Sequence, residues 1–168
     1  MLKYVIKRAE EWDAAVLLKA FREIAQTSDW LLTEADELPK TIAKERAFIR
    51  QHRRSKNSTL AVAWVKGEVA GLVGAGGGSH RRNRHTAEVG LAIRKAYRGL
   101  GLGTVLMRYL IRWAKGAGIT RLHLSHVREN KIAGHLYRRM GFRREGVLRK
   151  GMKIGGRYHD MIVLAKIL

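Results

Sequence analysis

A glycine-rich segment in the middle of the chain constrains the fold more than any other feature. It reads Arg-Gly-Leu-Gly-Leu-Gly-Thr at 98–104 and follows an apolar run at 87–93 that predicts a strand. The apolar spacing over 105–117 predicts an amphipathic helix directly after it. A glycine turn between a strand and a helix lets the backbone approach an anion closely, and the helix start adds about half a positive charge. The segment therefore predicts an anion site, to which Arg98 adds a cation.

Two common phosphate-binding motifs do not fit this segment. No Gly-Lys-Ser/Thr closes it, which excludes the phosphate-binding loop of NTPases. The third glycine comes one residue too early for the Gly-x-Gly-x-x-Gly fingerprint of dinucleotide-binding proteins, and no ribose-binding acid follows at the expected distance. A tight strand-to-helix connection without a ligand remains an alternative.

The glycine segment and a second segment downstream resemble one family. The first matches the Arg/Gln-x-x-Gly-x-Gly/Ala pattern of the GNAT superfamily of N-acetyltransferases, with Arg98, Gly101 and Gly103 at the pattern positions. The second, at 130–142, resembles that superfamily's Asn-x-x-Ala-x-x-Leu-Tyr-x-x-x-Gly-Phe helix. The two follow each other in the right order and at the right separation.

The C-terminal part narrows the resemblance to one branch. Residues 145–148, the glycine pair at 155–156 and residues 158–160 are similar to the branch that contains amino-acid and ribosomal-protein N-acetyltransferases. The resemblance covers residues from about 86 to the C-terminus well, and the N-terminal half in outline. It implies an α/β protein with the GNAT acyl-CoA N-acyltransferase fold, in which helices flank a mixed, mostly antiparallel sheet.

The periodicity of the chain predicts a matching order of elements, β-αα-βββ-α-β-α-ββ, in a single domain over 1–168. Strands are expected at 3–8, 59–65, 69–74, 86–93 and 121–127, and on both sides of the glycine pair at 155–156. Helices are expected at 10–26 with Trp12 and Val16 on the apolar stripe, from Pro39 in a first turn, at 105–117, and around the stripe from Ala133 to Met140.

The resemblance implies that acetyl-CoA is the cosubstrate and that its pyrophosphate binds the glycine segment. It implies no metal. The residues that it implies for acetyl-CoA binding are Leu91, Ile93, Arg98, Gly99, Leu100, Gly101, Leu102, Gly103, Thr104, Asn130 and Ala133.

Two residues match catalytic positions of the family. Glu88 matches a glutamate that often serves as general base, usually through water, and strand alternation places it on the face of Gly90 and Ala92, where a ligand has room. Its alternative is a solvated edge position or a partner for an arginine. Tyr137 matches the tyrosine whose hydroxyl lies at the thioester sulfur, and its alternative is a simple core residue on the apolar stripe of its helix.

Two further polar residues have structural alternatives. Asn130 fits a helix N-cap as well as a contact to CoA, and it can be both. His126, at the end of the strand at 121–127, is interpreted as an ordinary strand histidine rather than a base.

The chemistry that these residues imply is direct transfer within a ternary complex. A primary amine must lose a proton before it attacks the thioester, and Glu88, or a water that it orients, would take that proton. Backbone N–H groups near Leu91, released where the strands at 86–93 and 121–127 separate, would stabilise the oxyanion. Tyr137 would protonate or hydrogen-bond the departing thiolate, and proximity would supply much of the rate.

Composition excludes several other classes. The chain has 168 residues, 46% of them hydrophobic, which suffices for a sizeable core. It has no cysteine, which excludes disulfides, a cysteine zinc site and a covalent acetyl-cysteine intermediate. No apolar run has transmembrane length, and the apolar stretch at the N-terminus is too short for a signal peptide. The expected protein is a cytoplasmic homodimer with no membrane association.

The net charge of +20 is the unusual quantity, because one cofactor does not require so many cations. Three interpretations stay open: a surface that docks nucleic acid or ribosomes, a solvated face without a partner, and a chain engineered toward positive charge. Aromatic residues do not alternate with the basic runs, as a stacking platform for bases would require. We therefore expect at most weak, non-specific binding of nucleic acid.

The acceptor is the least defined part of the function. Amino acids, small amines and protein N-termini all fit the family, whereas a surface of +20 repels polyamines. Acids are scarce, yet Asp29, Glu34, Asp36 and Glu37 cluster between the first two helices, where the family has a wall of the acceptor cleft. Asp29 and Glu34 are the candidate acceptor-binding residues. The alternative is helix capping, with Asp36 or Glu37 ahead of Pro39.

A non-catalytic protein of the same fold is the alternative to an enzyme. In that case the basic surface would serve as a module that docks on RNA or ribosomes. Salt-sensitive RNA binding without acetyl transfer would distinguish it from a transferase.

Overall fold

The protein folds around one seven-stranded sheet with the order β1-β2-β3-β4-β5-β7-β6. The computed structural model describes residues 3–39 and 41–168. The strands are β1 (Val5–Arg8), β2 (Thr59–Val65), β3 (Glu68–Gly77), β4 (Thr86–Ile93), β5 (Arg121–Val127), β6 (Arg143–Ile154) and β7 (Arg157–Ile167). The helices are α1 (Ala14–Gln26), α2 (Ile42–Arg54), α3 (Leu102–Gly116) and α4 (Lys131–Arg139), with short 3-10 turns at Glu11–Asp13 and Lys95–Tyr97. The expected order of elements is confirmed.

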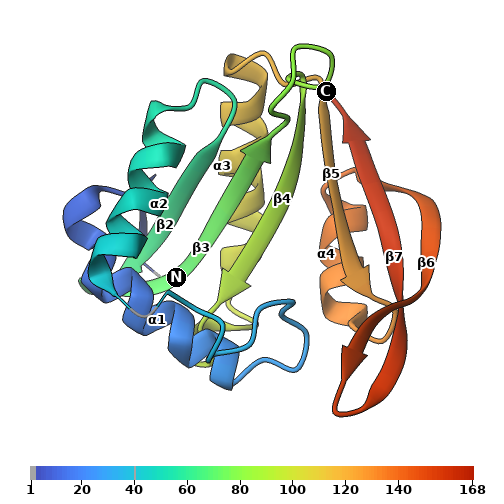
Figure 1. Ribbon diagram of the computed structural model, residues 1–168, viewed down its shortest axis with the longest axis horizontal. Coiled ribbons are helices and arrows are strands. Elements are labelled where there is room, and N and C mark those ends of the chain that lie inside the picture. The colour runs from blue at the N-terminus through green and yellow to red at the C-terminus, as the bar shows by residue number, and fades with distance from the viewer. Residues whose placement is uncertain (1–2, 40) are drawn as a thin grey trace.

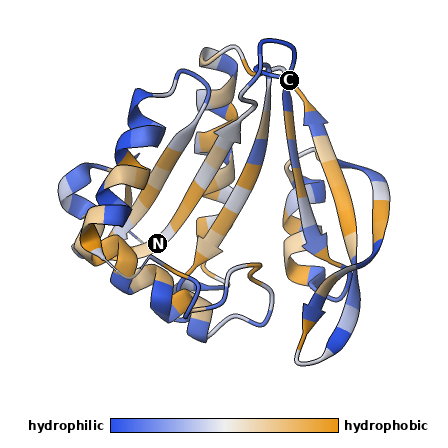
Figure 2. Ribbon diagram, viewed as in Figure 1, coloured by the Kyte–Doolittle hydropathy of each residue, from blue (hydrophilic) through white to orange (hydrophobic). Residues whose placement is uncertain are grey.

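The helices cover both faces of the sheet. α1 and α2 lie on one face, and α3 and α4 lie on the other (Figure 1). Figure 2 shows hydrophobic residues along the central strands, whereas the C-terminal turns of α2 are hydrophilic. This pattern is the one expected for a sheet that is buried between two helical layers.

Strands β4 and β5 form the only parallel pair of the sheet in the described residues. Their pairing is restricted to three rungs and ends at Glu88↔His123. Beyond this rung the two strands diverge toward their C-terminal ends, as Figure 1 shows. The predicted separation is therefore confirmed, and β4 continues past Glu88 without a ladder partner on its β5 side.

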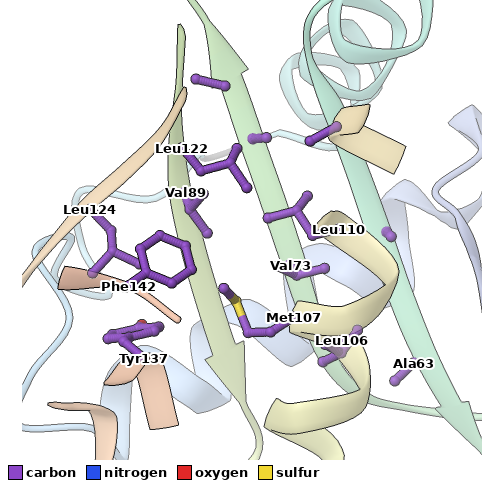
Figure 3. Close-up of a cluster of buried hydrophobic side chains, with 14 of the residues drawn as sticks. Ala63, Val73, Val89, Leu106, Met107, Leu110, Leu122, Leu124, Tyr137 and Phe142 are labelled. Atoms are coloured by element: carbon purple, nitrogen blue, oxygen red, sulfur yellow. The ribbon is translucent and has the colours of Figure 1, made fainter. Parts of the chain in front are cut away.

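Each face of the sheet has its own hydrophobic core. On the α3 side, Leu106, Met107 and Leu110 of α3 are fully buried against the strands, and Tyr137 and Phe142 extend this core toward β5 (Figure 3). On the α1 and α2 side, a smaller cluster contains Leu17, Ile49 and Val62. Each such side chain contributes about 1.5–3 kcal/mol on burial, so the two cores hold the helices firmly on the sheet.

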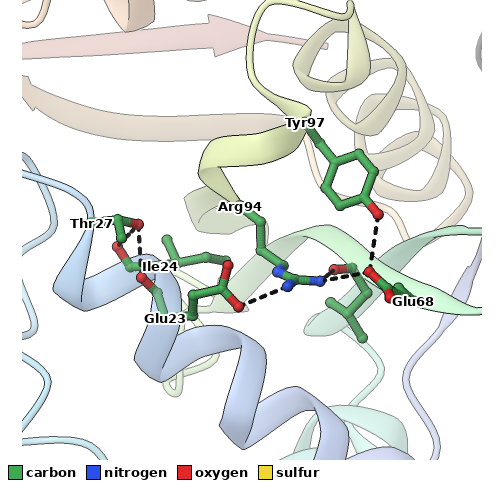
Figure 4. A network of polar contacts seen from close by, with 7 residues as sticks. Glu23, Ile24, Thr27, Glu68, Arg94 and Tyr97 are labelled. Carbon is green, nitrogen blue, oxygen red and sulfur yellow. Dashed lines mark hydrogen bonds and ion pairs between the residues drawn. The ribbon is translucent and has the colours of Figure 1, made fainter.

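A polar network fixes the C-terminal end of β4. The Arg94 guanidinium forms ion pairs with Glu23 of α1, 2.8 Å away, and with Glu68 of β3, 3.3 Å away (Figure 4). It also donates to the carbonyl of Val69, and the Tyr97 hydroxyl donates to Glu68 at 3.2 Å. The network joins α1, β3 and β4 at the point where the chain enters the glycine segment.

The structure corrects the expected start of the second helix. α2 begins at Ile42, and the hydroxyl of its N-cap Thr41 accepts from the backbone N–H of Lys44 at 3.3 Å. Pro39 therefore precedes the helix instead of lying in its first turn. The Glu37 carboxylate accepts from the N–H of Glu34, and neither it nor Asp36 caps the helix, so the capping alternative is wrong.

Two other boundaries differ from expectation. β3 runs to Gly77, three residues beyond the expected end, because its glycines pair with β4, as in Gly76↔Glu88. α3 begins at Leu102, ahead of the expected residue 105.

The apolar stripe expected for the first helix is wrong at Trp12 and Val16, although Ile24, which was also expected on it, is buried. Trp12 is 75% exposed and Val16 is 47% exposed, whereas Leu17 and Leu18 are buried. The 3-10 turn at Glu11–Asp13 has three residues per turn rather than 3.6, so the phase read from Trp12 does not continue into α1. In the part of the chain that the structure describes, no helix combines the length and apolar character needed to cross a membrane.

Candidate active site

A cavity of about 800 Å³ opens where β4 and β5 diverge. Its walls come from both faces of the sheet. α1, α2 and the segment between them form one side, and α4 together with Arg98, which precedes α3, forms the other. Strands β3 to β7 supply its floor and its far wall. The size and the position between elements are typical of a ligand site.

The glycine segment presents a row of free backbone donors. Gly99 and Gly101 have φ of +74° and +81°, and this left-handed backbone turns the chain into α3, whose N-cap is Gly101. The N–H groups of residues 99–103 donate to no other group of the described residues. Five consecutive unpaired N–H groups at a helix start can bind an anion, which is the role that the sequence predicts for this segment.

Thr104 differs from its neighbours. Its N–H donates to the carbonyl of Gly101 at 3.0 Å, so the backbone of Thr104 closes the first turn of the helix instead of facing outward.

Arg98 is held in place by the protein itself. Its Nε donates to the carbonyl of Ile93 and its Nη1 to the carbonyl of Thr27, both at 3.1 Å. These two bonds connect the end of β4 to the end of α1, and Arg98 lines the cavity. The guanidinium is thus a fixed cation at the mouth of the glycine segment, with fewer free donors than an unbound arginine.

Leu102 and Gly103 are buried, so neither presents a side chain to a ligand. Leu102 is 2% exposed and belongs to the core. A Cβ at Gly103 would lie 2.9 Å from Cδ2 of Leu136, so this glycine also allows α3 to approach α4. Leu100, by contrast, is exposed.

Four other residues assigned to the cofactor line the cavity. Leu91 and Ile93 of β4 are half-buried and pack on the core beneath α3. Asn130 is the N-cap of α4, and its side-chain oxygen accepts from the N–H of Ala133 at 3.1 Å. This hydrogen bond confirms the interpretation of Asn130 as an N-cap. Asn130 and Ala133 also line the cavity.

Tyr137 belongs to the core and to the cavity wall at once. The residue is 7% exposed, and its ring lies 6.0 Å from that of Phe142 and 6.1 Å from that of His126, measured between ring centroids. Burial raises the pKa of the Tyr137 hydroxyl to about 12. The hydroxyl therefore keeps its proton throughout the neutral range and acts as a hydrogen-bond donor.

Glu88 lies at the last paired rung between β4 and β5, opposite His123, and lines the cavity. β4 is an interior strand, so Glu88 does not occupy a sheet edge. Among the described residues it forms no ion pair, which removes the alternative of a partner for an arginine. Its neighbours across the ladder and along the strand, Gly76 and Gly90, leave the space beside it open.

His126 lines the cavity as well, which the interpretation as an ordinary strand histidine missed. Its Nδ1 lies 2.8 Å from the carbonyl of Val127, so Nδ1 carries the proton and Nε2 keeps a lone pair in the neutral ring. The ring rests on α4, where a Cβ at Gly134 would lie 3.1 Å from Nε2.

The other half of the cavity was not predicted from the sequence. Its lining is mostly apolar and comes from residues far apart in the chain: Ile24, Trp30, Leu31, Leu32, Phe48, Met152 and Met161. No spacing connects these positions, and the only available signal was the family's use of the segment between α1 and α2. Asp29 and Glu34 lie in that segment with exposed side chains and are not among the lining residues.

Two known proteins are similar to part of the chain. A 52-residue stretch, 31% of the chain, is 38% identical to the uncharacterized N-acetyltransferase YobR of Bacillus subtilis, and 110 residues, 63% of the chain, are 26% identical to the L-amino acid N-acetyltransferase AaaT of Escherichia coli. These matches span 21% and 66% of the relatives' own lengths.

A solved structure matches the whole chain. The crystal structure of a GNAT-family acetyltransferase from Streptococcus pneumoniae is 30% identical, covers 99% of this chain and 100% of its own, and has a TM-score of 0.96. The sequence model of the acetyltransferase (GNAT) family matches residues 24–142. The chain therefore belongs to the GNAT family of acetyltransferases.

Proposed function

We propose that the protein transfers an acetyl group from acetyl-CoA to a primary amine, directly between the two bound substrates. One observation carries the proposal: Arg98, which directly precedes the unpaired N–H groups of residues 99–103, lines the same cavity as Tyr137 and Glu88. A helix start with unpaired donors, next to a cavity that contains a neutral hydroxyl and a carboxylate, supplies the groups that this transfer requires.

The cofactor side of the cavity fits acetyl-CoA. The N–H groups of residues 99–103 and the fixed Arg98 would bind its pyrophosphate. Residues 91–93 of β4 have no ladder partner on the β5 side, because the pairing ends at Glu88. Their backbone is therefore free to bind the part of acetyl-CoA beyond the pyrophosphate. The capped start of α4, with Asn130 and Ala133, forms the opposite side.

On the acceptor side, Glu88 would take the proton from the amine, directly or through a water molecule. Attack on the thioester creates an oxyanion, and the unpaired N–H groups of β4 near Leu91 are fixed donors for it. Because both substrates lie in one cavity, orientation supplies part of the rate.

Tyr137 would stabilise the departing thiolate. A hydroxyl with a pKa of about 12 holds its proton more firmly than a free thiol, whose pKa is about 8.5. Tyr137 therefore donates a hydrogen bond to the thiolate sulfur rather than giving up its proton completely.

A panel of primary amines, assayed by the release of free thiol from acetyl-CoA, tests the proposal. We expect release that depends on the amine and yields the N-acetylated product by mass spectrometry. Salt-sensitive RNA binding without thiol release from any amine would instead favour the basic, non-catalytic docking module. The cytoplasmic location, the homodimer and the weak binding of nucleic acid stay predictions.

A further inference from the structure

The acceptor half of the cavity presents large apolar side chains that the protein itself does not cover. Leu32 is 78% exposed and Phe48 is 45% exposed, although both line the cavity. Met152 and Met161 of the β6–β7 hairpin also line the cavity, although both are largely buried. Methionine adapts its shape to an apolar ligand, and exposed apolar groups gathered in a cavity indicate a ligand with matching surface.

The charged groups of the cavity are distributed unequally. Among the described lining residues, the side chains of fixed charge are Glu88 and Arg98. Arg98 lies at the glycine segment, and its Nε and Nη1 are bound to the carbonyls of Ile93 and Thr27. In the part of the chain that the structure describes, the acceptor half therefore contains a carboxylate and no cation of its own that could bind a second carboxylate.

This distribution disfavours a free amino acid. Its carboxylate lies within about 4 Å of its amine, so an amine placed at Glu88 brings two negative charges close together. With about 7 Å between the two carboxylates, the repulsion at an effective dielectric constant of about 20 corresponds to a loss of about tenfold or more in affinity. The many cations of the surface do not compensate, because in residues 3–39 and 41–168 Arg98 alone among them lines the cavity.

The floor of the acceptor half has room for a bulky substituent. Gly76 and Gly90 lie on the same side of the sheet as Glu88, and a Cβ at either position would meet no heavy atom within 4 Å. Neither glycine has a positive φ, so the backbone conformation does not require glycine at these positions. The missing side chains leave open space beside Glu88. A side chain on the substrate could occupy this space against Leu32 and Phe48.

We infer that the acceptor is an apolar primary amine whose amine-bearing carbon carries no free carboxylate. The inference rests on the proposed acetyl transfer and narrows its substrate. Apolar contact supplies the affinity, since a surface with a net charge of +20 repels a cationic ammonium at long range. An arylalkylamine and the N-terminus of a peptide that begins with an apolar residue share this chemistry.

A matched set of acceptors tests the inference. Thiol release is measured with phenylalaninamide, phenylalanine, phenethylamine and ethylamine, and kcat/KM is expressed per concentration of free-base amine. We expect phenylalaninamide to exceed phenylalanine, and phenethylamine to exceed ethylamine, each by tenfold or more. A short peptide amide with N-terminal phenylalanine distinguishes a peptide acceptor from a small amine. A kcat/KM well above that of phenethylamine indicates a peptide, and one well below it indicates a small amine.

Two outcomes overturn the inference in different ways. If phenylalanine reacts within threefold of its amide, the acceptor class is wrong while acetyl transfer stands. If no amine releases thiol, the proposed function fails together with the inference.

A pair of glycine variants tests the space beside Glu88. Gly76→Val fills the floor, and we expect it to lower kcat/KM for phenethylamine at least tenfold while ethylamine changes less than threefold. Gly116→Val is the control, because Gly116 at the end of α3 has equally open surroundings and does not line the cavity. An equal loss for both amines in Gly76→Val would contradict the inference.

A third variant serves if Gly76→Val does not fold. Leu32→Gln changes an exposed side chain, so the fold is expected to tolerate it. We expect kcat/KM for phenethylamine to fall at least threefold and that for ethylamine to stay unchanged. An unchanged value for phenethylamine would remove Leu32 from the acceptor site and contradict the apolar wall.

Discussion

The two halves of the cavity are built in opposite ways. The half that we propose for the cofactor consists largely of backbone: the unpaired N–H groups of residues 99–103, the unpaired edge of β4 and the capped start of α4, with the side chain of Arg98 beside them. The acceptor half consists of side chains, which come from α1, α2, the segment between them and the β6–β7 hairpin. Backbone recognises what every family member shares, a diphosphate and a thioester, whereas side chains can change without disturbing the fold.

This difference predicts where substitutions act. A change in the cofactor half alters backbone geometry and should affect every acceptor equally. A change in the acceptor half should alter the choice of amine and leave acetyl-CoA binding intact. Glu88 and Tyr137 line the same cavity, and we propose that they act on the reacting groups. Their substitution should therefore lower kcat.

Gly101→Val should have the largest effect, loss of acetyl-CoA binding. Valine is strongly disfavoured at φ +81°, and the strain of about 1–3 kcal/mol would move the N–H groups at the start of α3 out of line. Calorimetry should show a Kd raised more than a hundredfold, while circular dichroism shows a folded protein. Gly116→Val, at the other end of the same helix, should bind as the parent does. An unchanged Kd for Gly101→Val would remove the glycine segment from the cofactor site.

Glu88→Gln should follow, with kcat lowered about 10² to 10⁴-fold, as for a lost general base. Glutamine keeps the size and the polarity of glutamate but cannot accept the proton of the amine, so the fall in kcat reports the lost base. kcat is measured with one amine at saturating acetyl-CoA. A variant that keeps the kcat of the parent would show that positioning alone carries the reaction.

Tyr137→Phe should have a smaller effect, because it removes a hydrogen bond and leaves the ring in the core. A hydrogen bond to a charged group is worth about 1.5–3 kcal/mol, which corresponds to a fall in kcat of roughly ten- to a hundredfold. With a pKa of about 12, the hydroxyl is neutral across the assay range, so the fall should be independent of pH below about pH 10. A KM for acetyl-CoA that rises in proportion would indicate a binding role instead.

The same difference between backbone and side chains explains which parts of the site could be predicted from the sequence. The glycine segment and the start of α4 are continuous stretches whose function depends on local backbone, so Gly101 and Asn130 were predictable from residue type and order. The acceptor wall joins Trp30, Phe48 and Met161 only after the sheet has formed, and no periodicity reports such contacts. The start of α2 was predicted wrongly because two residues near it are both typical of a helix start. Pro39 fits a first turn, but Thr41 provides the cap.

Asn130→Ala and Thr41→Ala form a matched pair with smaller effects. Each residue caps a helix through one side-chain oxygen, at 3.1 Å in α4 and 3.3 Å in α2. Each substitution should cost about 1 kcal/mol, or about 2–4 °C in Tm. Only Asn130 lines the cavity, so only Asn130→Ala should raise the KM for acetyl-CoA, by severalfold. Equal kinetics in the two variants would reduce Asn130 to a cap.

Neutralising Asp29 and Glu34 together should have the smallest effect. They lie in the segment between α1 and α2 with exposed side chains that do not line the cavity, and neither carboxylate forms a hydrogen bond in the described residues. They can therefore act on an ammonium substrate only at a distance, through a field that salt screens over about 10 Å at 0.1 M. The variant Asp29→Asn with Glu34→Gln should raise the KM for the amine about twofold at low salt and not at 0.5 M, with the KM for acetyl-CoA and Tm unchanged. If the KM for the amine does not move at low salt, the acidic cluster plays no part in acceptor binding, and the apolar wall alone selects the substrate.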